Sequence, residues 1–188
     1  MRSAPVVVML LLGAAILWAQ RATAAASKSF LTVASKNPTV MSHAGIAFLK
    51  RREGFSATAY PDGRDASGKQ LYSIAYGHQI VPGDGLSPSS VVTEKQGSDI
   101  FLRDLASREK LIRDSVRVPI TQPMFDALVS LAYNIGNSAF LKSTLLKKLN
   151  AKDYAAAARE FMAWTKSGTQ NVERRKQEAA IFSGGSYA

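Results

Sequence analysis

The chain of 188 residues is long enough to bury one or two small cores, and 46% hydrophobic residues exclude a disordered or fibrous protein. Lysine and arginine outnumber aspartate and glutamate by 24 to 14, so the net charge of +10 favours polyanionic partners such as a cell envelope or a nucleic acid. The lack of cysteine excludes disulfides and thiolate chemistry, and the presence of only 2 histidines argues against a multi-histidine metal centre.

The first 26 residues have the layout of an export signal. Arg2 precedes an apolar run, Pro5–Ala19, and the small-residue stretch Ala22–Ala26 follows it. The run is shorter than the roughly 20 apolar residues that a membrane span needs. The pattern predicts either a cleaved signal or an anchor that later leaves the bilayer, hence transient membrane contact and a periplasmic or secreted protein. Residues 27–41 then fit a linker, and residues 42–188 the folded domain.

A helix is predicted at the start of this domain. Ser42 can cap a helix that runs to Arg52, and on it Ile46, Leu49 and Glu53 fall on one face. A carboxylate would therefore lie in line with an apolar stripe, at the end of the helix.

Two short strands, Phe55–Tyr60 and Leu71–Tyr76, are predicted next from their aromatic and β-branched residues. The segment between them, Pro61–Gly68, has the composition of a turn. Glu53 would then face a hairpin that carries Asp62, and glycoside hydrolysis needs two such carboxyl groups in different environments. Spacing alone also allows an ordinary helix-end Glu and an ordinary turn Asp.

The rest of the chain is predicted to be helical. Thr93 can cap a helix long enough to connect two lobes. Behind Thr121, a strongly apolar series closed by Gly136 predicts a buried helix. Two further helices are predicted, Thr144–Asn150 and Asp153–Trp164.

Two other features invite a functional interpretation. His78 could act as a general base, but a lone His beside a Gly is more often a structural hydrogen-bonding partner, and we assign it no catalytic role. The run Arg174-Arg175-Lys176 fits a solvated helix face, with a site for an anionic ligand as the alternative.

Several separate motifs, in order along the chain, resemble the phage-type lysozymes of glycoside hydrolase family 24. They are Arg52-Glu53-Gly54-Phe55, Ala59-Tyr60-Pro61-Asp62, Ser73-Ile74-Ala75-Tyr76-Gly77-His78, Gln122 with Phe125-Asp126-Ala127-Leu128, Asn134-Ile135-Gly136, Ser143-Thr144-Leu145-Leu146, and Arg174-Arg175 with Glu178. The resemblance spans about residues 42–182 and implies an α+β, mostly α, two-lobed lysozyme fold, with a small β-hairpin lobe next to the catalytic Glu.

The resemblance also implies an activity and its residues. The protein would be a muramidase that cuts the β-1,4 bond between N-acetylmuramic acid and N-acetylglucosamine in peptidoglycan. Glu53 would donate a proton to the leaving oxygen, Asp62 would stabilise positive charge on the sugar or activate water, and Ser73 would position that water. His78 would pair with Asp104, and no motif calls for a metal or an organic cofactor.

The hairpin departs from the family's pattern. Ten residues separate Asp62 from Ser73, about five more than is usual, and they offer Asp65 as a competitor for the second carboxylate. Ser73 stands where the family has Thr and has more rotamer freedom. Ala75 stands where the family generally has Gly, and it would add strain if that backbone needs a positive φ.

Other functions stay open on the sequence. A lytic transglycosylase also works from one Glu but needs no positioned water. A non-catalytic, cationic envelope-binding protein would need only the charge and the apolar N-terminus. Nucleic acid is not an expected partner, because no recognition motif accompanies the charge. We expect a monomer, and a phage endolysin, a virion lysozyme or a bacterial copy would all fit.

Overall fold

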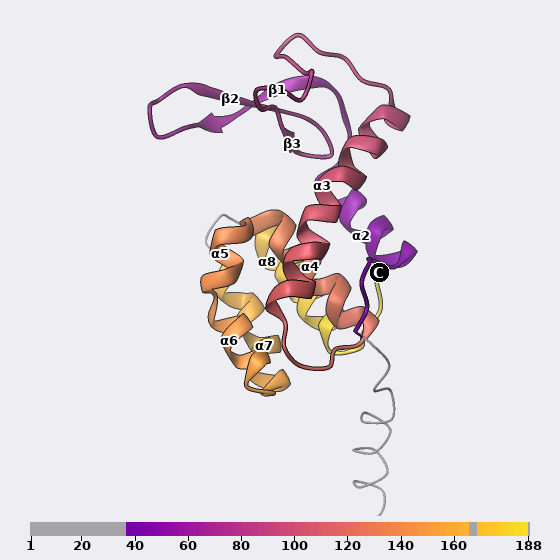
Figure 1. The fold of residues 1–188 in the computed structure, drawn as a ribbon, viewed down its shortest axis with the longest axis vertical. Coiled ribbons are helices and arrows are strands. Elements are labelled where there is room, and N and C mark those ends of the chain that lie inside the picture. Colours follow the sequence, from indigo (N-terminus) through magenta and orange to yellow (C-terminus); the bar gives the residue numbers. More distant parts are fainter. Residues whose placement is uncertain (1–36, 166–168, 188) are drawn as a thin grey trace, which may run out of the picture. The chain divides into compact units, whose positions relative to one another are not determined.

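The computed structural model of the chain describes residues 37–165 and 169–187. The predicted export signal and residues 27–36 of the predicted linker lie outside these ranges. Within them, no helix has the length and apolar character to cross a membrane. The elements in chain order are α2 (His43–Glu53), β1 (Ser56–Arg64), β2 (Gln70–Ala75), β3 (His78–Gln79), α3 (Glu94–Ser115), α4 (Gln122–Ile135), α5 (Asn137–Lys142), α6 (Thr144–Asn150), α7 (Tyr154–Glu160), the 3₁₀ helix η1 (Phe161–Trp164) and α8 (Thr169–Phe182) (Figure 1).

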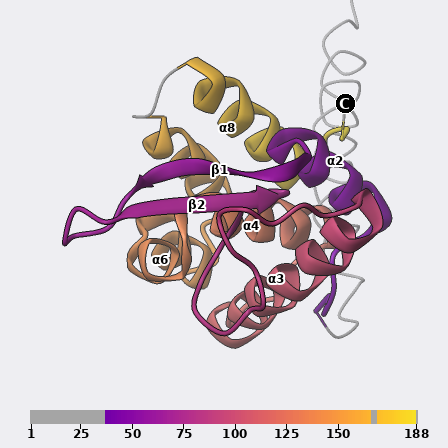
Figure 2. The same ribbon diagram turned by 90° about the horizontal axis from the view of Figure 1, so that it is seen from above.

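The predicted α+β class and two-lobed arrangement are confirmed. A three-stranded antiparallel sheet in the order β1-β2-β3 forms the small lobe, and the helices that follow α3 form the large one. The long helix α3 starts beside the sheet and ends among the other helices (Figure 1). Strands β1 and β2 lie side by side and extend as a hairpin away from α3 (Figure 2).

Polar residues cap the helices where the sequence predicts. Ser42 Oγ accepts a hydrogen bond from the Gly45 amide at 3.0 Å, and Thr93 forms a reciprocal capping box with Gln96. Thr121 and Ser143 cap α4 and α6, and each side chain accepts one hydrogen bond from an amide in the first turn of its helix. Each cap satisfies an amide that the helix cannot pair internally, which fixes the residue at which the helix begins.

Helix α2 is anchored at its start by a buried carboxylate. Asp126, which is 1% exposed, accepts hydrogen bonds from the Ser42 amide at 3.0 Å, from Gln122 Nε2 at 2.8 Å and from the Tyr187 hydroxyl at 2.7 Å. Since Glu53 is the last residue of α2, this anchor in α4 fixes the helix that carries the candidate acid.

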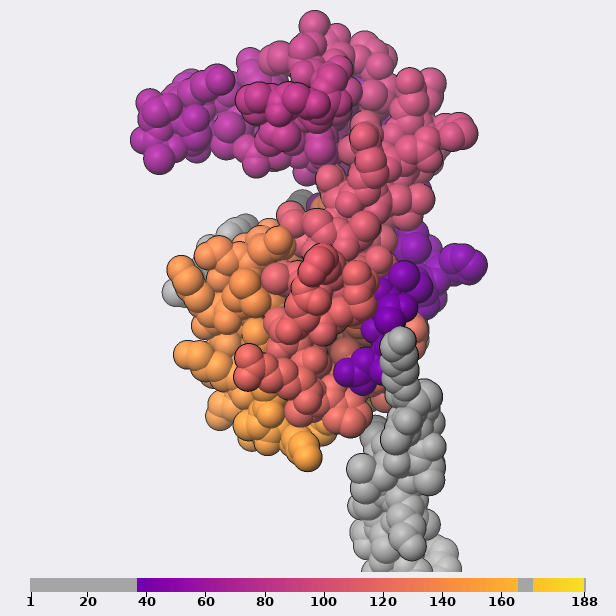
Figure 3. All heavy atoms as spheres, in the orientation of Figure 1, coloured from indigo at the N-terminus to yellow at the C-terminus, as the bar shows by residue number. Residues whose placement is uncertain are grey.

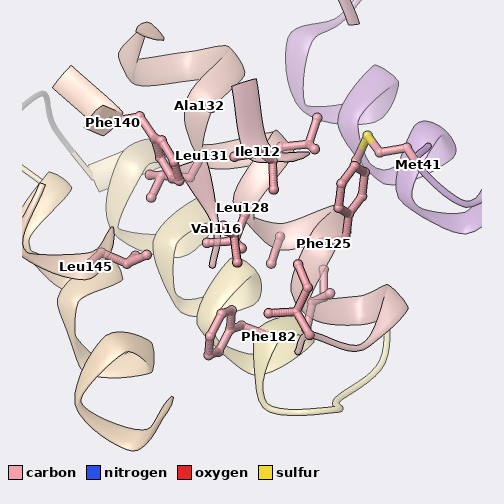
Figure 4. Packing of buried hydrophobic residues seen from close by; sticks show 14 of the residues in the cluster. Met41, Ile112, Val116, Phe125, Leu128, Leu131, Ala132, Phe140, Leu145 and Phe182 are labelled. Atoms are coloured by element: carbon pink, nitrogen blue, oxygen red, sulfur yellow. The ribbon is translucent and has the colours of Figure 1, made fainter. Parts of the chain in front are cut away.

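Two hydrophobic cores support the two lobes. The large core surrounds α4, in which every residue from Phe125 to Ala132 is buried (Figure 4). Full burial of one such Leu or Phe stabilises the fold by about 1.5–3 kcal/mol. The small core lies under the sheet and consists of Ile74, Ala75, Val92 and Ile100. Helix α3 contributes to both, with Ile100 in the small core and Phe101 in the large one.

Ordered contacts begin before the predicted start of the domain at Ser42. The Asn37 side chain donates to the Val118 carbonyl at 2.9 Å and accepts from the Ile120 amide at 3.0 Å. Met41 is 4% exposed and belongs to the large core. Residues 37–41, which the sequence suggested were linker, therefore pack on the fold.

The prediction of a turn over Pro61–Gly68 is wrong in its first half. Strand β1 continues to Arg64, and the turn itself covers residues 65–69. Pro61 is tolerated because β1 is an edge strand of the sheet, where an amide is not needed on the outer side. Composition could not reveal this, since Pro, Asp and Gly are typical of turns as well as of edge strands and bulges.

The single helix predicted over Asp153–Trp164 is also corrected. Asp153 caps α7 by accepting from the Ala156 amide at 3.0 Å, but the α-helix ends at Glu160 and η1 continues as a 3₁₀ helix. Phe161 at this change is fully buried, with its ring centroid 5.5 Å from that of Phe182. The tertiary contact with α8, which is remote in sequence, therefore accompanies the break.

Candidate active site

Glu53 ends helix α2 and lies where the two lobes meet. Gly54 has a φ of 69°, which stops the helix at this residue. The Glu53 side chain is 15% exposed, and its Oε1 lies 2.8 Å from Arg174 Nη2 of α8. The other oxygen, Oε2, faces Gly77 in the turn after β2. The carboxyl group is thus largely buried, paired on one side and open to the hairpin on the other.

The basic run on α8 is a buried network, which corrects the interpretation of a solvated helix face. Arg174 and Arg175 are 5% and 0% exposed, and only Lys176 is exposed. Both guanidinium groups bind Glu178, at 3.0 Å each, and Ser130 Oγ donates to Glu178 Oε1 at 2.6 Å. The buried set of two arginines with Glu178 and Glu53 is therefore electrically balanced when both carboxyls are ionised.

Arg174 remains a cation in this setting. Burial acts to lower its pKa, but the charges of Glu53 and Glu178 outweigh burial and raise the pKa above its usual value. The Arg174 side chain also donates to the Ser130 carbonyl at 3.2 Å, which fixes its direction. Glu53 is consequently held by a rigid positive charge.

Asp62 and Ser73 meet across the hairpin. Ser73 Oγ donates a hydrogen bond to Asp62 Oδ2 at 2.6 Å. Ser73 is fully buried, whereas Asp62 is exposed. Between the pairs Pro61 with Tyr72 and Arg64 with Gln70, β1 has one residue more than β2. Asp62 lies at this bulge, two residues after Tyr60, which is the direct partner of Ser73.

The Asp65 side chain forms hydrogen bonds within the turn of the hairpin. Its Oδ1 accepts hydrogen bonds from the Ser67 hydroxyl at 2.6 Å, from the Ser67 amide at 2.9 Å and from the Lys69 amide at 3.0 Å. The hydrogen bonds from Ser67 and Lys69 lower the pKa of Asp65. The additional residues therefore lengthen the strands and the turn, while Asp62 keeps its contact with Ser73.

Tyr60 lies in the field of both carboxyl groups. It pairs with Ser73 in the register of β1 and β2, and the residue is 37% exposed. Burial and then the charges of Asp62 and Glu53 raise its pKa. Glu53 and Asp62 therefore border one region, and the molecular surface is hollowed between the hairpin and the helices below it (Figure 3).

Ala75 has the positive φ for which Gly would be suited. Its φ is 58°, and its methyl group is buried against Gly97 of α3. A Cβ atom at Gly97 would lie 3.1 Å from the Ala75 methyl and 2.6 Å from the Phe55 ring. Gly97, which the sequence analysis did not single out, therefore makes room for the alanine.

His78 binds two carboxylates. Its Nδ1 lies 2.8 Å from Asp104 Oδ2, so the predicted pair is confirmed, and its Nε2 lies 3.2 Å from Asp84 Oδ2. The hydrogen bond with Asp104 is the main cause that raises the pKa of His78, against the opposite effect of burial. Asp84 was missed because its loop carried only the signal of a turn. Its two oxygens also accept the Val81 and Leu86 amides at 2.8 Å each.

Comparisons with known proteins identify the family of this chain. The family model described as phage lysozyme matches residues 50–178. The endolysin of Salmonella phage P22 is 40% identical over 142 residues, which cover 73% of this chain and 94% of that protein. The endolysin of Bacillus phage PZA is also 40% identical, over 77% of this chain, but this chain spans only 55% of its length.

Solved structures of lysozyme-like proteins have the same fold. The muramidase domain of SpmX from Asticaccaulis excentricus superimposes with a TM-score of 0.67 at 27% identity, and the match covers 78% of this chain and 98% of that domain. The sequence match and the two-lobed fold agree. The chain belongs to the phage lysozyme family.

Proposed function

We propose that this protein is a muramidase that hydrolyses the β-1,4 bond between N-acetylmuramic acid and N-acetylglucosamine in bacterial peptidoglycan. The observation that carries the proposal is the pair of carboxyl groups in unlike environments. Glu53 is 15% exposed and paired with Arg174, whereas Asp62 is exposed on the facing hairpin. Glycoside hydrolysis assigns different roles to two such groups.

Glu53 is the proposed proton donor. Because Oε1 faces Arg174, Oε2, which faces the hairpin across Gly77, is the oxygen that would hold the transferred proton. In the protonated form Glu53 would pass this proton to the glycosidic oxygen as the bond breaks. Arg174 fixes the direction of the carboxyl group and compensates the negative charge that the transfer leaves on it.

Asp62 is the proposed second carboxylate, and Ser73 orients it. The Ser73 hydroxyl has one hydrogen to donate, and it uses it in the hydrogen bond to Asp62 Oδ2. Asp62 Oδ1 then remains available to accept a proton from water or to stabilise positive charge on the sugar ring. In this arrangement Ser73 acts on the water through Asp62.

The substrate and the compartment follow from the same proposal. A glycan strand in the hollow of Figure 3 would reach both carboxyl groups, and a net charge of +10 favours an anionic cell wall. We expect a monomer without a cofactor, brought to the periplasm or secreted by its N-terminal segment.

The test is the chemistry of fragments released from purified peptidoglycan, measured by mass spectrometry. The native protein should release fragments with reducing ends. Glu53→Gln should lower that release by about 100-fold or more at an unchanged melting temperature. Glu173→Gln, which removes an exposed carboxylate from α8, is the matched control and should keep the native rate.

The other possible results distinguish the rival functions. Anhydro ends would identify a lytic transglycosylase, and binding without fragments would identify an envelope-binding protein. A folded Glu53→Gln variant that cleaves at a near-native rate would remove Glu53 from the mechanism.

A further inference from the structure

We propose that Tyr60 is a substrate-binding residue, whose hydroxyl donates a hydrogen bond to an acceptor oxygen of the sugar held between Glu53 and Asp62. The inference rests on the proposed function and adds a residue to it. Three observations carry it, namely the register of the hairpin, the exposure of Tyr60 and the engagement of two donors of the site, Ser73 and Arg174, by other partners.

The hairpin register places Tyr60 on the face of the site. Tyr60 and Ser73 are direct partners in the antiparallel pair of β1 and β2. Side chains of direct partners lie on the same face of a sheet, about 4.5–5.5 Å apart at Cβ. Ser73 holds Asp62 through its hydroxyl on this face. Tyr60 is therefore the cross-strand neighbour of the residue that orients the second carboxylate.

The exposure of Tyr60 suits contact with a ligand. Tyr60 is 37% exposed, although it lies beside a fully buried serine. The nearby carboxylates of Asp62 and Glu53 disfavour loss of the phenolic proton, and so does burial. The hydroxyl consequently keeps its proton at neutral pH and can act as a donor.

Two donors of the described site, Ser73 and Arg174, are already engaged. Ser73 donates its hydrogen bond to Asp62, and Arg174 is directed at Glu53, Glu178 and Ser130. A carboxylate can only accept hydrogen bonds, and the proton proposed for Glu53 goes to the glycosidic oxygen. The sugars of peptidoglycan present carbonyl oxygens on their N-acetyl groups, which need a donor. Tyr60 supplies that donor on the hairpin face.

Tyr72 provides a matched control on the same hairpin. It pairs with Pro61 and is adjacent to Ser73 along β2, so its side chain lies on the opposite face. The change of Tyr to Phe removes one hydroxyl at either position and leaves the ring in place. Only the variant on the face of Ser73 should affect the substrate.

The experiment compares Tyr60→Phe, Tyr60→Ala and Tyr72→Phe with the native protein. Initial rates of reducing-end release from soluble peptidoglycan strands give KM and kcat, and thermal melting reports the fold. Tyr60→Phe should raise KM by about five- to tenfold, the effect of one lost hydrogen bond, at an unchanged melting temperature. Tyr72→Phe should match the native protein. Tyr60→Ala should raise KM at least as much as Tyr60→Phe does.

Binding separates this inference from the proposed function. Glu53→Gln and Glu53→Gln/Tyr60→Phe are compared for sedimentation with insoluble peptidoglycan, which requires no catalysis, and the double variant should bind about five- to tenfold more weakly. A native rate and native binding for Tyr60→Phe would overturn the inference, even if Tyr60→Ala were impaired. Equal losses in Tyr60→Phe and Tyr72→Phe, with lowered melting temperatures, would also overturn it. If the native protein releases no reducing ends, the proposed function fails, and the binding comparison still decides the role of Tyr60.

Discussion

Ala75 combines two opposing contributions to stability at one residue. Its left-handed backbone costs about 1–2 kcal/mol relative to Gly. Its buried methyl group contributes about 0.8 kcal/mol, and Gly would add unfolded-state entropy worth about 0.4–1 kcal/mol. These terms nearly cancel, so the structure tolerates an alanine where the family generally has a glycine.

We therefore expect Ala75→Gly to change the free energy of unfolding by less than about 1 kcal/mol. Ala75→Val should cost about 2 kcal/mol or more, because a β-branched residue is poorly suited to positive φ and Gly97 and Phe55 leave no space for it. Urea denaturation of the two variants measures both values. If Ala75→Gly lowers the free energy of unfolding by more than about 2 kcal/mol, the backbone at Ala75 is not strained.

The two aspartates of the hairpin should differ in effect. Asp62→Asn is expected to lower cleavage by at least about tenfold, because Asp62 faces Ser73 at the site. Asp65→Asn should leave the rate near native, because Asp65 is engaged in the turn by Ser67 and Lys69. Initial rates on peptidoglycan make the comparison, and each variant is the control for the other. A larger defect in Asp65→Asn would assign the second carboxylate to Asp65.

Single residues of the site were predictable to different degrees. Spacing alone left Glu53 and Asp62 open as ordinary helix-end and turn residues, and the family resemblance made them candidates. The structure puts Ser73 next to Asp62. The burial of Arg174 was not predictable, because a charged run usually marks a solvated face and its partner Glu53 is remote in sequence. The role of Asp84 was not predictable either, because its contact with His78 depends on how the loop folds back.

At the scale of elements, His78 connects three of them. It is the first residue of β3, binds Asp104 in α3 and binds Asp84 in the loop after β3. Its pKa is raised in the folded state. The stabilisation that follows is fully present below the unfolded pKa of about 6.5 and is lost as the pH rises through the folded pKa.

The melting temperature of the native protein should therefore decline as the pH is raised from about 6 through the folded pKa of His78. His78→Gln should have a lower melting temperature at pH 6 and less of this decline. A double-mutant cycle with Asp104→Ala, read by thermal melting, measures the coupling between the two residues. Strictly additive losses would contradict the pairing, and a collapse of the cleavage rate in folded His78→Gln would place His78 in the catalytic machinery.

The elements themselves followed the sequence closely where a cap or a strong apolar pattern was present. Thr93 and Thr121 marked the starts of α3 and α4, because a cap is a local interaction between residues close in sequence. The extent of β1 and the change from α7 to η1 depend on neighbours from other parts of the chain. Pro61 pairs with Tyr72 of β2, and Phe161 packs against Phe182 of α8.

For the whole molecule, the N-terminal segment is the main prediction that lies outside the described residues. Removal of residues 1–26 should leave a soluble enzyme that cleaves purified peptidoglycan but no longer lyses its own host from within. Lysis assays during expression, with the full chain as control, measure this. Unchanged lysis by the shortened chain would mean that another protein carries it across the membrane.

The boundary of the fold can be tested with two further truncations. A chain that starts at Asn37 should keep the melting temperature of the chain that starts at residue 27, because the described contacts begin there. A chain that starts at His43 would lose the buried Met41 and the contact between Ser42 and Asp126, and it should melt at a clearly lower temperature. Equal melting of all three chains would show that residues 37–42 do not contribute.

The shared helix α3 has a consequence for how the molecule opens. The small core has only four buried residues, and one of them, Ile100, adjoins Phe101 of the large core. So small a sheet is not expected to be stable alone. Amide hydrogen exchange in β2 should therefore be governed by the N-terminal turns of α3, so that both exchange as one cooperative unit, while the C-terminal part of α3 exchanges with α4 only on global unfolding.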